Sequence, residues 1–395
     1  MRQIINDKSI FYSGLAYFVV MLCFIAIRLV YGLGLLGDVQ KDTTDFLFTF
    51  IVQVVILFLV PFVFMRFCAK QQPKTLFKKA SFKPISGMMV VWSLVLGICT
   101  YIAILFVSSF WSGILAMFGY SSSSSVVTQP ATAYPVVNLL LGILFVGVLP
   151  GFGEEFSHRG VVLGNIKKDG VWRAILLSSL LFGLMHLNIM QVGYAFVVGL
   201  ILSTTTLLTK SIVPAMIIHC TSNSISTYLG FASDNNWFGA GFFDTINAWI
   251  NGGNFMASFL ISTLILCIVV SLIFYAMFSL FKHSKKNEFF AFKRRLQKNL
   301  KNSEYADQID LNNNEQVFKL YQEAQLVNIQ KKLMTSDLTL SQLEHNIDKA
   351  TVWSIVFDED VTKKSKICHL DYLFYYCSIF LGTVVTIITM IWGII

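Results

Sequence analysis

The chain has 395 residues, of which 55% are hydrophobic and only 13% are charged, and its formal net charge is +8. This composition is typical of a polytopic membrane protein and excludes a globular domain with one large core. The positive charge requires no nucleic-acid partner, because the lysines cluster beside apolar runs. The seven cysteines follow neither a zinc-like spacing nor a disulfide framework.

About nine apolar runs are long enough to span a bilayer, so we expect an all-α polytopic membrane protein. The third run is too long for one straight helix perpendicular to the membrane, so it should be tilted, broken or partly outside. The runs cover residues 10–36, 46–68, 86–119, 136–156, 174–191, 192–209, 211–230, 255–281 and 371–395.

The loops between these runs alternate in charge, which predicts an orientation. The loop at 66–83 carries six basic residues and no acid, whereas the loop at 120–135 carries no charge. Because cytoplasmic loops are rich in lysine and arginine, the N-terminus should be cytoplasmic and the C-terminus outside. We therefore expect a multi-pass protein of a cell membrane, with the look of a bacterial plasma-membrane protein.

Three domains follow from the change in composition after residue 281. Residues 1–281 form a multi-helix transmembrane domain with a motif-bearing core at 136–230, and residues 367–395 form a C-terminal transmembrane anchor. Residues 282–366 are polar and basic and predict a cytoplasmic helical module. Within this module, 289–296 mixes aromatic with basic residues, which fits a helix lying on an anionic membrane surface or an ordinary solvated helix.

The first motif is Glu154-Glu155-x-x-x-Arg159, at the end of a long apolar run. Ionisable groups at membrane depth are costly, which favours a functional role. On a helix, Glu155 and Arg159 share a face and can pair, whereas Glu154 points about 100° away and stays free as a base. The alternative is a plain ion pair at a helix end.

Polar residues also interrupt two later runs. His186 lies in the fifth run, and His219 and Asn223 lie four residues apart on one face of the seventh. Glu154, His186 and Asn223 are equally far from the nearest cytoplasmic base, which places each about 20 Å along its helix, with His219 roughly one turn shallower. Three helices should therefore present these side chains at similar depth. A helix–helix hydrogen bond is the alternative for either histidine alone.

This set of side chains suits the hydrolysis of a carbonyl group. The glutamate can act as general base on a water, while histidine or asparagine donors stabilise the oxyanion. Two histidines and a carboxylate could instead hold zinc, and spacing does not separate these mechanisms. The chain lacks His-Glu-x-x-His and Gly-x-Ser-x-Gly, so neither a zincin nor a serine hydrolase is indicated.

The three motifs in this order resemble the signature of the CAAX protease and bacteriocin-processing family, also called Abi-type intramembrane proteases. They are Glu154-Glu155-x-x-x-Arg159, Phe182-x-x-x-His186 and His219-x-x-x-Asn223, and the resemblance covers roughly residues 86–281. It implies a core of about eight helices and endopeptidase activity within the membrane, on membrane-associated or lipid-modified peptides or proteins. It also implies site roles. Glu154 activates the water, His186, His219 and Asn223 complete the site, and Glu155 and Arg159 support it.

A metal-free glutamate mechanism is favoured over zinc, because asparagine is a poor zinc ligand and a better oxyanion donor. If zinc is present, Glu154, His186 and His219 would hold it. His158 departs from the aromatic residue usual in the family, and we expect it to be an interfacial histidine without a role. A proton-coupled transporter or a non-enzymatic immunity protein is the alternative to a protease, although no internal inverted repeat is evident.

Overall fold

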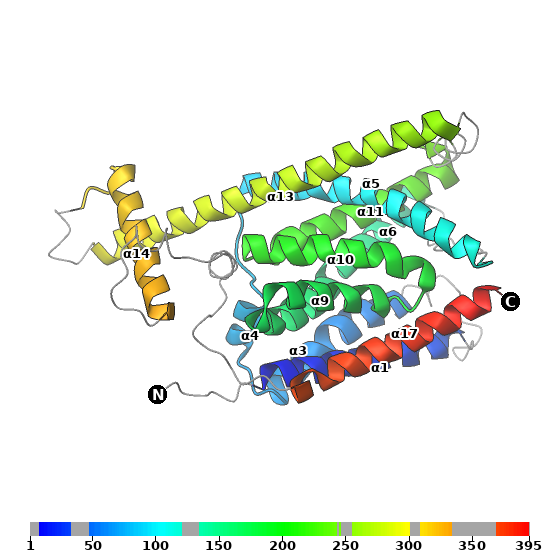
Figure 1. Ribbon diagram of the computed structural model, residues 1–395, viewed down its shortest axis with the longest axis horizontal. Helices are drawn as coiled ribbons and strands as arrows, with labels where there is room; N and C mark the ends of the chain where they lie inside the picture. The colour runs from blue at the N-terminus through cyan, green and yellow to red at the C-terminus, as the bar shows by residue number, and fades with distance from the viewer. Residues whose placement is uncertain are drawn as a thin grey trace.

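The computed structural model describes residues 8–32, 47–120, 134–242, 245, 255–300, 309–333 and 369–394. Every regular element in these ranges is helical, as predicted from the apolar runs. Seven helices of the described chain are long and apolar enough to cross a membrane, so this is a multi-pass membrane protein. Most of the bundle helices run roughly parallel to one another in Figure 1.

All nine predicted runs contain helix, but the helices of the fifth and seventh runs, Val171–Met185 and Val213–Asn235, are not among the seven that are long and apolar enough to cross a membrane. The elements are α1 (Ser9–Gly32), η1 (Ile51–Leu59), α3 (Val60–Phe67), α4 (Pro73–Lys79), α5 (Gly87–Met117), α6 (Pro135–Gly142), η2 (Ile143–Val148), α7 (Leu149–Glu155), η3 (Phe156–Leu163), α8 (Gly164–Ile166), η4 (Lys167–Asp169), α9 (Val171–Met185), α10 (Ile189–Thr209), α11 (Val213–Asn235), α13 (Phe255–Leu300), α14 (Asn314–Leu333), η6 (His369–Tyr372) and α17 (Leu373–Ile394). The long third run forms the unbroken helix α5, so its length requires tilt or an end outside the bilayer.

The fourth run contains the glutamate motif and is an almost continuous helical path from α6 to η4. It includes two π-helical segments, η2 and η3, and the site helix α7 lies between them. Pro150 stands in the first turn of α7, where a missing backbone N–H is tolerated. The path therefore continues past Pro150, and the glutamates lie well inside the bundle.

Glycines of η2 and α7 let the fourth run approach its two neighbours closely. A Cβ atom at Gly151 would lie 2.3 Å from Sγ of Cys220 in α11, and one at Gly147 would lie 2.5 Å from Oγ of Ser224. On the other side, a Cβ at Gly153 would lie 2.3 Å from the backbone oxygen of Gln53 in η1. Larger residues at these positions would push the helices apart. Glycine at the contact thus brings side chains from three helices within hydrogen-bonding reach.

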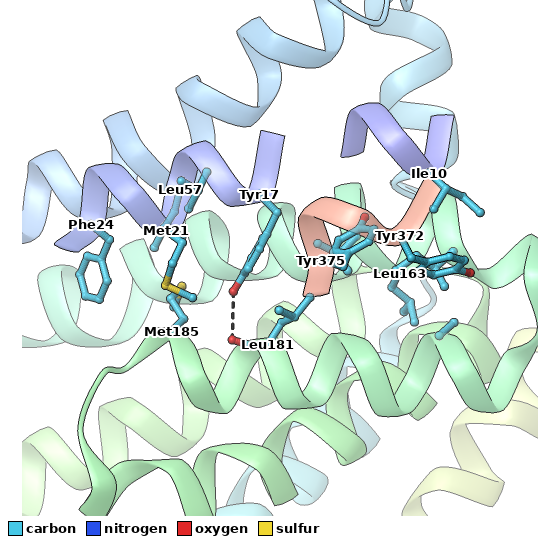
Figure 2. Close-up of a cluster of buried hydrophobic side chains, with 14 of the residues drawn as sticks. Ile10, Tyr17, Met21, Phe24, Leu57, Leu163, Leu181, Met185, Tyr372 and Tyr375 are labelled. Carbon is cyan, nitrogen blue, oxygen red and sulfur yellow. Dashed lines mark hydrogen bonds between the residues drawn. The ribbon is translucent and has the colours of Figure 1, made fainter. Parts of the chain in front are cut away.

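The last helix, α17, packs into the bundle against α1 and α9. Figure 2 shows the apolar cluster that joins them, with Tyr17 and Met21 of α1 facing α9 and Tyr375 nearby. The Tyr375 hydroxyl donates to Oγ of Ser13 at 2.7 Å, and a Cβ at Gly382 would lie 3.1 Å from Leu184. Helix α17, predicted to be part of a separate anchor, therefore contributes to the same core. The limits of the three predicted domains remain a prediction.

Helix α13 continues through the predicted boundary at residue 281 without a break and extends beyond the bundle, where α14 lies across it (Figure 1). Phe289 packs against Phe318 and Tyr321, with ring centroids 5.8 and 5.7 Å apart, and Phe292 packs against Tyr321 at 5.4 Å. Two aromatic side chains that could have faced a lipid surface thus contact α14. Much of the predicted module, 301–308 and 334–366, lies outside the described residues.

Candidate active site

Glu155 is the centre of a buried ionic network that joins three helices. Its Oε1 accepts hydrogen bonds from Nη1 of Arg159 and from Nδ1 of His219, each at 2.9 Å. Arg159 is 1% exposed, and its Nη2 donates to the Gly199 carbonyl of α10 at 3.3 Å. The predicted pairing of Glu155 with Arg159 is thus present in the structure, and it also binds α11.

Glu154 points away from this pair, as the helical spacing predicts, and its two oxygens have different surroundings. Oε1 accepts a hydrogen bond of 2.8 Å from Nε2 of Gln53 in η1. Oε2 lies 3.9 Å from Nε2 of His219, too far for a direct hydrogen bond. Glu154 is therefore held at one oxygen, while the other faces an imidazole nitrogen.

The tautomers of the two site histidines follow from their partners. Nδ1 of His219 faces a carboxylate, and Nδ1 of His186 lies 2.9 Å from the Phe182 carbonyl. Since a carbonyl or an ionised carboxylate can only accept, each Nδ1 carries the hydrogen, and each Nε2 of a neutral ring has a free lone pair. His186 follows the last residue of α9, and its ring and that of His219 both contact the ring of Phe182.

The Phe182 ring contacts four basic side chains at once. Its centroid lies 5.1 Å from the His158 ring, 5.3 Å from the His186 ring and 5.7 Å from the His219 ring, all edge-to-face. The guanidinium carbon of Arg159 lies over the same ring at 4.4 Å, which is a cation–π contact. Phe182 thus organises both histidines of the predicted site and the arginine that supports it.

Asn223 lies one turn farther along α11 than His219 and contacts a different part of the fourth run. Its Nδ2 donates to the Val146 carbonyl at 3.1 Å. Val146 belongs to the π-helical segment η2, so this bond links α11 to the distorted part of the run. One amide N–H of Asn223 remains for another partner.

The predicted depths need correction by about one turn. Glu154 was expected to be level with Asn223, but the contacts place it level with His219. The expected depth assumed an α-helical rise between Lys167 and Glu154, whereas this stretch includes the π-helix η3. A π-helix has more residues per turn and a smaller rise, so Glu154 lies closer to the basic end than predicted.

His158 was expected to be an interfacial residue, and this prediction is wrong. Its side chain is fully buried, because η3 turns it towards α1. Nδ1 lies 2.8 Å from the Glu154 carbonyl, and Nε2 lies 2.9 Å from the oxygen of Tyr17. The Tyr17 hydroxyl donates its hydrogen to the Leu181 carbonyl at 2.9 Å (Figure 2). His158 therefore links the backbone of the glutamate motif to α1 and α9.

Two contacts were not foreseen from the sequence. Gln53 is the sole polar residue of η1, and that interruption of an apolar run was the available signal. No sequence feature singled out Tyr17 as a contact residue, since a tyrosine in an apolar run is common near membrane interfaces.

The alternative zinc set was tested against the side-chain positions. Among the residues that the structure describes, no three His, Cys, Asp or Glu side chains come together as a metal-binding group. Glu154, His186 and His219 therefore do not fit a zinc site as they stand, and we derive no step through a metal.

Residues 136–225 match the family model described as "Type II CAAX prenyl endopeptidase Rce1-like". The chain contains an Rce1-like domain. The match includes all six predicted site residues but neither Gln53 nor Tyr17. No curated protein and no solved structure matches the chain.

The Rce1-like domain agrees with the family resemblance drawn from the three motifs. At the level of the family it supports a membrane-embedded endopeptidase, which implies a lipid environment and a peptide or protein substrate.

Proposed function

We propose that this protein is an intramembrane endopeptidase that hydrolyses peptide bonds through a water activated by Glu154. The observation that carries the proposal is the unequal environment of the Glu154 oxygens. Gln53 holds Oε1, whereas Oε2 lies 3.9 Å from Nε2 of His219. A single water bridges such a distance, with hydrogen bonds to both groups.

In the proposed reaction, Glu154 is the general base. The bridging water gives one proton to Glu154 and attacks the carbonyl carbon of the scissile peptide bond, which forms a tetrahedral intermediate. Glu154 then returns the proton to the leaving nitrogen as the C–N bond breaks. Glu154 thus gains and loses one proton within one turnover.

His219 orients the water, since its free Nε2 lone pair accepts the second water hydrogen. Glu155 fixes the ring by accepting from Nδ1 at 2.9 Å, and Arg159 balances the charge of that buried carboxylate. The amide N–H of Asn223 that does not bond to Val146 is the proposed oxyanion donor. His186 completes the site beside the same Phe182 ring.

The substrate in this proposal is a membrane-associated or lipid-modified peptide or protein. Glu154 and His219 are buried in the bundle, at 7% and 5% exposure, and lie beside a helix path long enough to cross the membrane. A bond anchored near the bilayer can reach them with little loss of the anchor's contact with lipid.

The test uses the full chain in lipid vesicles with two internally quenched peptides, one farnesylated near its C-terminus and one without a lipid. Wild-type protein should cleave the farnesylated peptide, and Glu154→Gln should abolish cleavage while the unfolding temperature is retained. Glutamine has the size of glutamate and keeps an oxygen that can accept from Gln53. A loss of activity in this variant is therefore not a loss of folding. If Glu154→Gln cleaves at the wild-type rate, or the wild type cleaves neither peptide, the proposal is wrong.

A further inference from the structure

We infer that Gln53 is a positioning residue for Glu154: its amide fixes the carboxylate so that the free oxygen faces His219. The inference rests on the proposed role of Glu154 as the general base. It adds a residue of η1, outside the matched segment 136–225, to the working site.

The surroundings of Gln53 set it apart from an ordinary packing residue. The other eight residues of η1 are apolar, and Gln53 itself is 7% exposed. An amide in such a place is costly unless it is hydrogen-bonded, and an apolar side chain would pack there at lower cost. The benefit that offsets this cost must come from its partner, and the partner of its N–H group is Glu154.

The hydrogen bond fixes the orientation of the Glu154 carboxylate, as a general base requires. The last torsion of a glutamate is broad, so an unrestrained carboxylate exposes either oxygen in many orientations. With Oε1 bound to Gln53 at 2.8 Å, that torsion is fixed and Oε2 is directed to within 3.9 Å of His219. The bond is also charge-assisted, because its acceptor is a carboxylate oxygen of the proposed base.

The backbone geometry is built for this contact. Gly153, directly before Glu154, lets α7 approach the Gln53 backbone so closely that a Cβ there would be 2.3 Å from the Gln53 carbonyl oxygen. Gln53 also stands in a π-helical segment, a distortion that is frequent at functional sites. The side-chain oxygen of Gln53 has no hydrogen-bond partner in the described structure, so the contact with Glu154 is made by the donor group of the amide.

The two possible roles of the Gln53 amide, structural and positioning, predict different experimental results. Helix–helix hydrogen bonds stabilise the fold, so their loss lowers the unfolding temperature without changing the turnover of the molecules that remain folded. Loss of a positioning bond lowers kcat in the folded molecules and leaves KM unchanged, because Gln53 contacts the base and not the substrate.

The decisive variant is Gln53→Met, which has similar length and no N–H. With the farnesylated quenched peptide and vesicle-reconstituted full chain, we expect kcat to fall about 10–100-fold, as for other residues that orient a catalytic group. KM should stay within about twofold, because a change confined to kcat marks an interaction absent from substrate binding. Ile56→Val is the matched control: it is a buried residue of the same helix in the apolar cluster, and it should leave kcat unchanged.

A second measurement checks the contact without relying on catalysis. Unfolding of Gln53→Met, Glu154→Met and the double variant forms a double-mutant cycle, and the two effects should be non-additive. Additive effects would overturn the inference, and so would a coupled pair in which Gln53→Met retains wild-type kcat. Inactive Glu154→Gln together with fully active Gln53→Met removes only this inference, whereas active Glu154→Gln removes the proposed function itself.

Discussion

Nδ1 of His219 donates to Oε1 of Glu155 at 2.9 Å, across 64 residues of sequence. The same carboxylate oxygen accepts from Arg159, so one buried anion fixes both a histidine tautomer and a guanidinium. A carboxylate behind a histidine is a common way to orient an imidazole and to set which nitrogen is free. The supporting pair predicted from the sequence thus acts on the site through His219.

Removal of Arg159 should destabilise the fold as well as the site. Arg159→Ala would leave Glu155 as a buried carboxylate without its ionic partner, at a cost of about 3–5 kcal/mol. We expect less folded protein after detergent extraction and an unfolding temperature several degrees lower, measured by thermal unfolding in detergent. Arg173→Ala is the control, since this exposed arginine pairs with Asp169 near the helix end. Equal stability of Arg159→Ala and the wild type would contradict the pairing.

Phe182→Leu should separate the aromatic contacts of the site from simple packing. The leucine keeps an apolar side chain but loses the ring that faces Arg159 and the three histidines. A desolvated cation–π contact alone is worth about 2 kcal/mol, so the variant should be less stable. The turnover of the folded fraction should also fall, because His186 and His219 lose the surface that orients them.

The control for this variant is Phe156→Leu. Phe156 is fully buried, but its ring packs against Phe58, Phe77 and Phe82 and, within the described part of the chain, against no histidine. It should lower stability to a similar extent without lowering kcat of the folded protein. Equal kcat values for the two variants would show that Phe182 acts through packing alone.

The sequence predicted the helices, and it singled out the candidate site residues, because both depend on local patterns. Long apolar runs can only be helices in a bilayer, and ionisable residues inside them are rare enough to stand out. The pairing of Glu155 with Arg159 followed from their spacing on one helix, and the structure bears it out. The direction of Glu154, away from that pair, followed from the same geometry.

Contacts between distant segments could not be read from the sequence. Tyr17 and His158 meet across 141 residues, and Gln53 reaches Glu154 across 101, with no local spacing to signal either contact. The predicted depth of Glu154 was wrong because no sequence feature of this run indicates that η3 is π-helical. Apolar composition specifies helix, but the register of each turn depends on which neighbours its side chains and carbonyls meet.

Asn223 bonds to the Val146 carbonyl and is also the proposed oxyanion donor, so its loss should change two quantities. Asn223→Ala should lower stability, because a backbone carbonyl loses its side-chain donor, and it should lower kcat, because the oxyanion loses its donor. Thermal unfolding in detergent and turnover in vesicles measure the two effects separately. Lower stability with wild-type kcat would assign Asn223 a structural role alone.

The choice between a glutamate base and zinc can be decided by two measurements on the same preparation. Without a metal, loss of one oxyanion donor costs about 10²–10³ in rate, so Asn223→Ala should fall by that factor. Asn223→Asp should be slower still, since a carboxylate repels the developing negative charge. With zinc the order of the two variants reverses, because an aspartate beside His219 is a better ligand than alanine.

The second measurement is the effect of a chelator on activity. A chelator should leave the glutamate enzyme active, whereas it would abolish the activity of a zinc enzyme and added zinc would restore that activity. Zinc present stoichiometrically in active protein, and lost together with activity, would overturn the metal-free mechanism and leave the endopeptidase assignment in place.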